Sequence, residues 1–310
     1  MKANFGLKTR GLMIAVFSEI LFGMSFIFIR LCIEDVSVFT LLSWRCIVAF
    51  IAMTGCVAAG LLDVNLKKRN LKPLLLISLF QPVLYYILET MGVRLTTASE
   101  SGVLVACIPI ITMIFSAVFL KDKPTGKQAV CMIVTVIGAV LIGVGGDITA
   151  SGNLLGYLFL LLAMCSEGAY SITSQKVQEF NSAEKTYAMV TSGVVVFTGV
   201  AVIEHIHSGT MMEYITMPFN DFRFGICILF LGLGCNVIAF FCANYAISVI
   251  GATKRAALAG IASIVSLVGG VFYLGETFTG MQVFATVLVL CGAFGVNAFG
   301  KKNDDQVILE

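Results

Sequence analysis

The stretch LKDKPTGKQ at residues 120–128 returns later in the chain as LGETFTGMQ at residues 274–282. The two copies stand 154 residues apart, the difference between positions 120 and 274. The same offset aligns three further pairs of identical residues: Ala98 with Ala252, Gly138 with Gly292, and Ala139 with Ala293. Agreement at one fixed offset indicates an internal repeat of about half the chain, because apolar composition alone would not keep a constant spacing.

The composition of the chain indicates a membrane protein. Hydrophobic residues make up 58% of its 310 residues and charged residues 12%, and the mean hydropathy is +0.97. A soluble globular chain is about a quarter charged, whereas a bilayer accepts helices that are apolar on every face. The 20 basic and 18 acidic residues nearly balance, so no strong field attracts nucleic acid. We therefore expect the lipid bilayer as the surroundings and no nucleic-acid partner.

Ten apolar runs are long enough to cross about 30 Å of hydrocarbon as helices that rise about 1.5 Å per residue. The first run ends at Arg30 without a small-residue cleavage site, so we interpret it as a retained span and not a signal peptide. The seventh run is short and leads into a polar segment, which we expect to be a solvated outward loop. The predicted spans are 11–31, 36–62, 73–93, 98–120, 128–145, 154–174, 187–203, 224–247, 252–274 and 279–299.

The lysine and arginine residues test this span count independently, since basic residues accumulate on the cytoplasmic side of membrane proteins. With the amino terminus inside, Arg30, Arg94 and Arg223 fall on the outer side and Arg45 falls within a span. The other sixteen of the 20 fall in cytoplasmic segments: Lys2, Lys8, Arg10, Lys67, Lys68, Arg69, Lys72, Lys121, Lys123, Lys127, Lys176, Lys185, Lys254, Arg255, Lys301 and Lys302. This asymmetry predicts a multi-pass protein of the cell membrane with both termini in the cytoplasm.

Each copy of the repeat holds five of the ten spans. Because five is odd, the second copy must lie upside down relative to the first. We therefore predict an all-α integral membrane protein of ten transmembrane helices, built from two inverted five-helix repeats at residues 1–150 and 151–310. Inverted repeats are the architecture of many secondary transporters, which keep a midplane substrate site between the two halves.

Short motifs occur at corresponding places of the two halves: Phe22-Gly23 with Ser25-Phe26 in the first span, Gly168-Ala169-Tyr170 in the sixth, Pro109 followed by Lys121-Asp122 around the end of the fourth, and Leu274-Gly275-Glu276 at the end of the ninth. In their order and spacing they resemble the drug/metabolite transporter superfamily, in particular its ten-helix EamA-type members. The chain departs from that pattern where Phe22 replaces a tryptophan, Ser263 a proline, and Lys121-Asp122 a Gly-Glu pair. The resemblance covers nearly the whole chain and implies transport of a small molecule through a central cavity.

Charged residues inside the spans carry the clues to the substrate, because a charge near the bilayer centre costs about 3 kcal/mol and seldom lacks a role or a partner. Three carboxylates, Glu19, Glu89 and Glu167, share the spans with one arginine, Arg45. This excess of acids favours a cationic or amine-bearing guest. The alternative is that the glutamates are neutral or pair with Arg45 and serve packing. We expect Arg45 itself to be structural, either pairing with an acid or reaching outward.

Helical spacing groups each acid with polar or aromatic side chains. Gln81, Tyr85 and Glu89, for example, recur every four residues and share one face of a helix. A carboxylate beside aromatic rings can hold an organic ammonium through charge and cation–π attraction. The candidate substrate-binding residues are Glu19, Phe22, Gln81, Tyr85, Glu89, Glu167, Tyr170 and Asn244, the last equivalent to Thr90 in the other repeat. Glu19 and Glu167 are also the candidates for proton coupling.

Three functions fit these observations. The first is a secondary transporter for a small cationic or zwitterionic metabolite, resembling an amine or amino acid, which it exchanges for protons. The second is a transporter of the same fold that carries an anionic solute such as a nucleotide sugar. Only Arg45 supports this alternative. The third is a non-transporting membrane-embedded protein or enzyme.

Sequence motifs argue against catalysis. The chain has no H-E-x-x-H, no nucleophile elbow and no nucleotide-binding P-loop. His205 and His207 have the spacing of metal ligands, but two histidines without further ligands are typical of a solvated loop. We therefore predict no catalytic residues, no metal and no cofactor, and nothing in the pattern specifies an oligomeric state.

Overall fold

The computed structural model describes residues 2–67, 69–121, 124–145, 153–277 and 279–299. Within these ranges the chain is helical apart from short connections, and it contains no strand. Lys68, Lys123, the predicted loop around Asp147, and the terminal Lys301 and Lys302 lie outside the described residues.

Eight helical segments of this described chain are long and apolar enough to cross a membrane. They are α1 (Lys2–Ile33), α2 (Val38–Ala58), α3 (Lys72–Ser78) with η1 (Leu79–Leu84) and α4 (Tyr85–Leu95), α5 (Ala98–Val105) with α6 (Ile108–Phe119), α8 (Asn153–Lys176), α9 (Ser182–Ser208), α11 (Phe222–Leu229) with η2 (Phe230–Ala239) and α12 (Phe240–Ile250), and α13 (Ala252–Ala256) with α14 (Ala259–Tyr273). The predicted spans 128–145 and 279–299 are the helices α7 (Gly126–Gly145) and α15 (Gly280–Ala298), whose apolar stretches are shorter.

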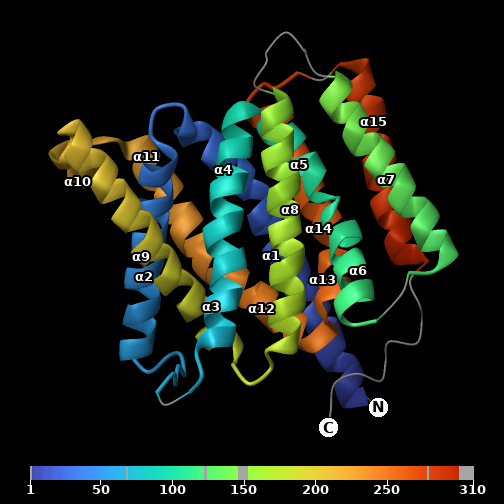
Figure 1. The fold of residues 1–310 in the computed structure, drawn as a ribbon, viewed down its shortest axis with the longest axis horizontal. Coiled ribbons are helices and arrows are strands. Elements are labelled where there is room, and N and C mark those ends of the chain that lie inside the picture. The colour runs from blue at the N-terminus through green and yellow to red at the C-terminus, as the bar shows by residue number, and fades with distance from the viewer. Residues whose placement is uncertain (1, 68, 122–123, 146–152, 278, 300–310) are drawn as a thin grey trace.

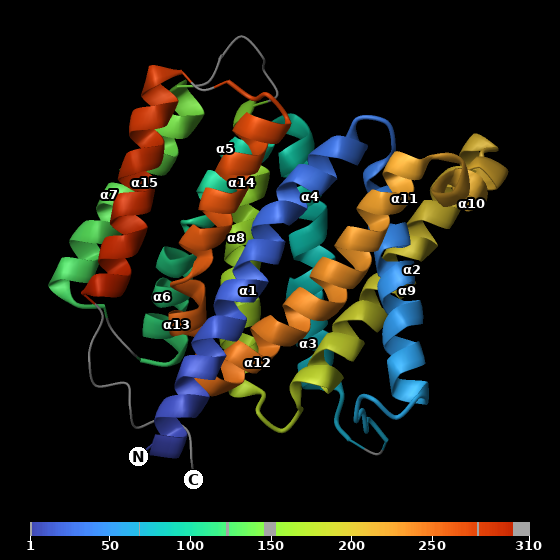
Figure 2. The same ribbon diagram turned by 180° about the vertical axis from the view of Figure 1, so that it is seen from behind.

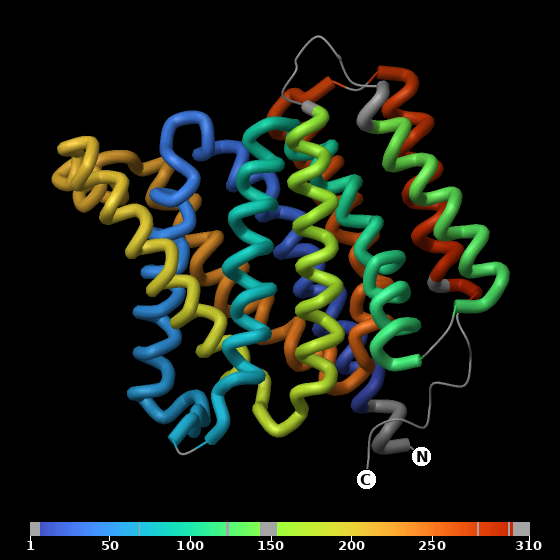
Figure 3. Tube along the Cα trace, in the orientation of Figure 1, coloured from blue at the N-terminus to red at the C-terminus, as the bar shows by residue number. Residues whose placement is uncertain are grey.

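Figures 1 and 2 show these helices side by side in one bundle, with α7 and α15 paired at one edge and α9 and α10 (Met211–Asn220) at the other. The same views show that α1 begins and α15 ends at one end of the bundle. Figure 3 traces the α2–α3 and α8–α9 connections at that end as well. We call it the terminal end.

Four of the spanning segments are interrupted, in pairs that correspond between the two halves. The predicted span 73–93 passes through η1, a wider π-helical turn, where Gln81 has the non-helical angles φ −140° and ψ 111°. Pro82 follows it and cannot donate a backbone hydrogen bond, which explains why the regular ladder breaks there. The equivalent segment of the second half contains η2, and the pairs α5–α6 and α13–α14 are each broken shortly after their start. Interruptions of this kind free backbone groups inside a bundle.

The repeated stretch begins a helix in both halves through the same hydrogen bonds. The Thr125 N–H donates to Gln128 Oε1 (2.8 Å), and the Gln128 N–H donates to Thr125 Oγ1 (3.3 Å). Thr279 and Gln282 make the same reciprocal pair at 3.0 and 3.2 Å. Each pair is a capping box that satisfies two otherwise unpaired donors at a helix start. The recurrence of T-G-x-Q therefore has a local structural cause at the starts of α7 and α15.

The glycines that the repeat aligns lie where α7 and α15 meet. A Cβ at Gly138 would stand 2.9 Å from the Ala285 carbonyl oxygen, and one at Gly292 would stand 2.8 Å from the Cys131 carbonyl oxygen. Each glycine thus lets its helix approach the backbone of the other, as small residues do between membrane helices.

Glu276, near the start of the second copy of the repeated stretch, caps helix α5. Both carboxylate oxygens of Glu276 accept backbone hydrogen bonds there, from Ala98 (2.8 Å) and Ser99 (2.9 Å). The preceding residue, Gly275, has a positive φ of 69°. Lys121, its equivalent in the first half, also has a positive φ, 59°, although it carries a side chain. The departure of this chain from the Gly-Glu pattern therefore places a lysine in a conformation that favours glycine.

Replacing Lys121 by glycine is accordingly expected to stabilise the protein by about 1 kcal/mol, because a residue with a Cβ pays about 1–2 kcal/mol in the left-handed region. Thermal unfolding of the purified protein in detergent measures the change. The matched control is Gly275→Lys, which should lower stability by a similar amount. A Lys121→Gly variant no more stable than the parent would show that the lysine makes compensating contacts.

The prediction of an outward loop directly after residue 203 is wrong. Helix α9 continues to Ser208, so Glu204, His205 and His207 are helical, and it ends at Gly209 with φ 68°. The His205 ring stacks on Tyr214 of α10, and its two nitrogens lie 2.8 and 2.7 Å from the hydroxyls of Thr40 and Thr210. The seventh span was predicted too short because the sequence does not show that His205 contacts Thr40 of α2 and Tyr214 of α10.

Candidate functional site

A cavity of about 30 Å³ lies at the centre of the bundle, with walls from α1, α2, η1, α4, α5, α6, α8, α12 and α13. This volume holds about two water molecules. Of the eight residues proposed from the sequence, six line it: Glu19, Phe22, Gln81, Tyr85, Glu89 and Glu167. The helical spacing therefore identified side chains from three spanning segments that the fold brings together.

Glu19 of α1 and Glu167 of α8 share one arginine. Arg255 Nη2 lies 3.0 Å from Glu19 Oε1, and Arg255 Nη1 pairs with Glu167 Oε1. All three side chains are at most 4% exposed. Arg255, which the sequence assigned to a cytoplasmic segment, is buried in the bundle against both acids. The suggestion that these acids pair with Arg45 is wrong, because their ion-pair partner is Arg255. Arg255 falls inside the predicted span 252–274, and that position is the signal that could have identified it.

Arg45 of α2 is the second buried arginine of the cavity. Its Nη2 donates to Asn236 Oδ1 (2.9 Å), and its guanidinium lies 4.0 Å from the centre of the Tyr86 ring. Within the described ranges its Nε and Nη1 have no hydrogen-bond partner. The prediction that Arg45 pairs with an acid or reaches outward is wrong, because an amide and an aromatic ring hold it. Two of its donors remain available at the cavity.

Glu89 of α4 is the third buried acid. The Tyr85 hydroxyl, one helical turn earlier, donates to Glu89 Oε1 (3.0 Å), as the four-residue spacing predicts. No lysine, arginine or histidine of the described chain forms an ion pair with Glu89. Gln81 is fully buried nearby, and neither its Oε1 nor its Nε2 has a partner among the described side chains. Buried polar groups without partners cost free energy, so Glu89 and Gln81 are candidate binding groups of the cavity.

The charge count of the site is therefore closer to balance than the sequence indicated. Three carboxylates face two guanidinium groups, since Arg255 joins Arg45. One guanidinium holds two of the acids, whereas Arg45 and Glu89 each lack an ionic partner in the described structure. The cavity side chains without an ion pair are thus one arginine and one carboxyl group.

Aromatic rings form one wall of the cavity. The Phe22 ring meets Phe240 edge to face at 4.8 Å between centroids, and Arg255 lies 5.6 Å from the centre of Phe22. Tyr86 packs against Phe240 at 6.2 Å. Tyr86 and Phe240 were not among the residues predicted from the sequence, although they occupy equivalent positions at the offset of 154.

Tyr170 and Asn244 lie outside the cavity lining, in a second polar cluster. Tyr170 and Ser174 donate hydroxyl hydrogen bonds to Asn244 Oδ1 at 2.9 and 3.0 Å. Lys185 Nζ donates to the Ser174 carbonyl oxygen (2.7 Å), and the residue is only 2% exposed. Its place in a cytoplasmic segment stays a prediction. This cluster ties α8, α9 and α12 together beside the site.

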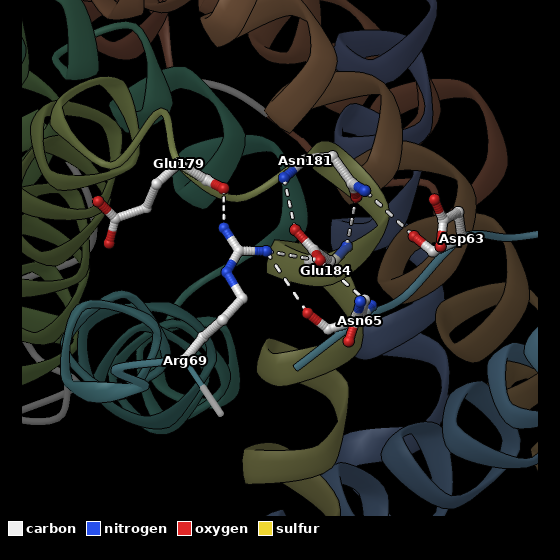
Figure 4. A network of polar contacts seen from close by, with 6 residues as sticks. All are labelled: Asp63, Asn65, Arg69, Glu179, Asn181 and Glu184. Carbon is white, nitrogen blue, oxygen red and sulfur yellow. Dashed lines mark hydrogen bonds and ion pairs between the residues drawn. The ribbon is translucent and has the colours of Figure 1, made fainter. Parts of the chain in front are cut away.

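A polar network joins two connections at the terminal end of the bundle (Figure 4). Arg69, after α2, pairs with Glu184 of α9 (2.9 Å) and also contacts the Glu179 carbonyl oxygen. Its guanidinium lies 4.0 Å from the centre of the Phe180 ring. The Asn181 side chain donates to the Asp63 carbonyl oxygen (3.1 Å), which adds a second link between the connections.

Known proteins resemble this chain over nearly its whole length. The family described as "EamA-like transporter family" matches residues 9–144 and again residues 154–298. The "Uncharacterized transporter YcxC" of Bacillus subtilis (strain 168) is 30% identical over 94% of this chain and 93% of its own length. "Uncharacterized transporter YetK" of the same organism is 22% identical over 91% of this chain and 85% of its own. A solved structure described as "Crystal structure of protein" has a TM-score of 0.62 and 15% identity, and the match covers 94% of this chain and 99% of that one, which supports the fold alone.

Proposed function

Because the chain belongs to the EamA-like transporter family, we propose that it is a secondary transporter that moves a small zwitterionic or cationic metabolite across the cell membrane by alternating access. The observation that carries this proposal is the pair of free charges in the cavity, Arg45 and Glu89. Its relatives are named transporters, which favours transport over a non-transporting membrane protein.

A zwitterion of the amino-acid type complements the free groups of the cavity. Its ammonium would bind Glu89, and its carboxylate would bind the unpartnered Nε and Nη1 of Arg45, with the Gln81 amide as a further partner. Charge-assisted hydrogen bonds of this kind are about twice as strong as neutral ones. The wall of Phe22, Tyr86 and Phe240 favours a guest with apolar surface. A cavity of about 30 Å³ is too small for such a guest, so binding must select a wider conformation.

The proposal includes ten membrane helices in two inverted five-helix repeats, residues 1–150 and 151–310. Support comes from the two successive family matches, the capping boxes of α7 and α15, and the corresponding interruptions η1 and η2. The network around Arg69 and Glu184 would then close the cytoplasmic end and open as the halves rock.

Reporter fusions test the proposed topology. A fusion after Glu310 is expected to report the cytoplasm, and a fusion in the segment around Asp147 the outer side, because five helices separate them. A reporter pair such as alkaline phosphatase and green fluorescent protein gives opposite signals on the two sides. Finding both positions on the same side would overturn the inverted-repeat proposal.

Proton exchange is proposed to run through Glu19 or Glu167, because one arginine holds both acids and a proton on either would loosen that contact. Glu19→Gln and Glu167→Gln each leave Arg255 one carboxylate partner. At least one of these variants should keep exchange of substrate for substrate in proteoliposomes but lose substrate-driven pH change, measured with an internal dye. If both single variants still moved protons with substrate as the parent does, this coupling proposal would fail.

A flux screen tests the function itself. Proteoliposomes would be offered labelled amino acids, amines and nucleotide sugars at matched concentrations. We expect uptake of at least one amino acid or amine and none of the nucleotide sugars. Uptake restricted to nucleotide sugars would instead favour the anionic alternative, which the free donors of Arg45 would then serve.

A further inference from the structure

A second cavity, distinct from the central one, opens at the side of the bundle near its terminal end. It has a volume of about 370 Å³ and lies between α1, the α13–α14 segment and α15. Its lining is apolar except for one lysine: Leu12, Lys254, Ala257, Leu258, Gly260, Ile261, Ala293 and Phe294. We call it the lateral groove. Its walls all belong to apolar helices of the bundle.

Small residues make the lateral groove. A Cβ built at Gly260 of α14 would meet no heavy atom of another residue within 4 Å, so open space lies beside it. Elsewhere α1 and α14 are in close contact, since a Cβ at Gly23 of α1 would stand 2.6 Å from the carbonyl oxygen of Ala262 in α14. α1 and α14 therefore touch at Gly23, and the lateral groove lies beside Gly260 between these helices and α15. Figure 2 shows α15 at one edge of the bundle, away from α1.

An apolar opening of this size does not remain empty in a bilayer. Water there would lack the two to four polar partners that it needs. An empty groove would forfeit the dispersion contacts of its walls. A hydrocarbon chain from the surrounding lipid satisfies both conditions.

The position of Lys254 identifies the kind of lipid. It is exposed, and it lies in the first turn of α13, at the end of its membrane-spanning segment. An ammonium at that depth attracts an anionic headgroup, and each such lysine contributes about 1 kcal/mol near an anionic surface. We propose that the lateral groove binds one anionic glycerophospholipid, with its phosphate on Lys254 and an acyl chain beside Gly260. The inference rests on the membrane location of the helices and not on the proposed substrate.

Native mass spectrometry of the protein from detergent tests this site by counting lipids that stay bound. Phosphatidylglycerol and phosphatidylcholine with identical chains are the probes. We expect one retained phosphatidylglycerol, with about fivefold weaker retention in Lys254→Gln, as the loss of one ionic contact implies. Gly260→Leu should abolish retention of both lipids, because its side chain would fill the groove, and Gly260→Ala should weaken it less.

Two control variants make the same types of substitution outside the lateral groove. Lys72→Gln removes an exposed lysine at the terminal end, and Gly199→Leu adds a side chain where a Cβ also meets open space. Both should retain lipid as the parent does. Equal retention by Gly260→Leu and Gly199→Leu, or equal retention of the two lipids by the parent, would overturn the proposal. A chain ending at Phe299 should bind lipid unchanged, and greatly increased binding would mean that the last residues occupy the groove instead.

Discussion

Replacing Arg255 by glutamine is expected to lower the free energy of unfolding by about 3–5 kcal/mol, because removal of one partner leaves buried charges uncompensated. Arg255 holds two acids, Glu19 at 3.0 Å and Glu167, and all three side chains are nearly inaccessible. Equilibrium unfolding of the protein in detergent measures the loss. It should exceed that of any other single substitution proposed above.

The triple variant Arg255→Gln, Glu19→Gln, Glu167→Gln should recover most of this stability, since no unpaired charge then remains. Arg10→Gln, at an exposed position of α1, is the control and should change stability by no more than about 0.5 kcal/mol. An Arg255→Gln variant as stable as this control would show that the two glutamates are held by something other than the ion pairs.

Replacing Glu89 by glutamine is expected to weaken binding of an amine-bearing guest by tenfold to several hundredfold, about the cost of removing one partner from a desolvated charge pair. The substitution keeps the acceptor for the Tyr85 hydroxyl but removes the negative charge. A guest of similar shape without the ammonium should bind almost unchanged. Isothermal titration or a thermal-shift series with the two guests separates these effects.

Arg45→Gln is the matched variant, for which we expect the opposite selectivity. It should weaken guests that carry a carboxylate and spare those that carry only an amine, because Arg45 offers the free cation of the cavity. Tyr85→Leu, which changes a lining residue bonded to Glu89, should lower affinity for charged and uncharged guests alike. Equal losses for every guest in Glu89→Gln would make this acid structural.

The sequence predicted the helical membrane character well because that depends on composition and run length. The repeated T-G-x-Q was detected as a pattern, and its cause, a capping box in each half, is a local interaction that sequence spacing encodes. The interruptions at η1 and η2 were harder to predict. Pro82 indicates the first, but the second half has no proline at its equivalent, where Asn236 stands.

Part of the site could be predicted because it also depends on local helical spacing. A four-residue spacing places Gln81, Tyr85 and Glu89 on one face, so their common position could be inferred. The partner of Glu19 and Glu167 could not be inferred, because Arg255 reaches them from a segment more than 80 residues away in the chain. Assigning Arg255 to a cytoplasmic segment left it out of the charge count of the site, so the predicted site was too acidic. Tertiary contacts of this kind leave no periodic signal in a single sequence.

Counterflow with three matched guests tests the central claim most directly. Proteoliposomes loaded with an unlabelled amino acid would be offered the same amino acid, its decarboxylated amine or its deaminated acid in labelled form. The arrangement of Arg45 and Glu89 predicts that the zwitterion exchanges faster than either analogue, and that Glu89→Gln and Arg45→Gln reduce this preference from opposite sides. Equal exchange of all three guests, or exchange of the deaminated acid alone, would contradict the account.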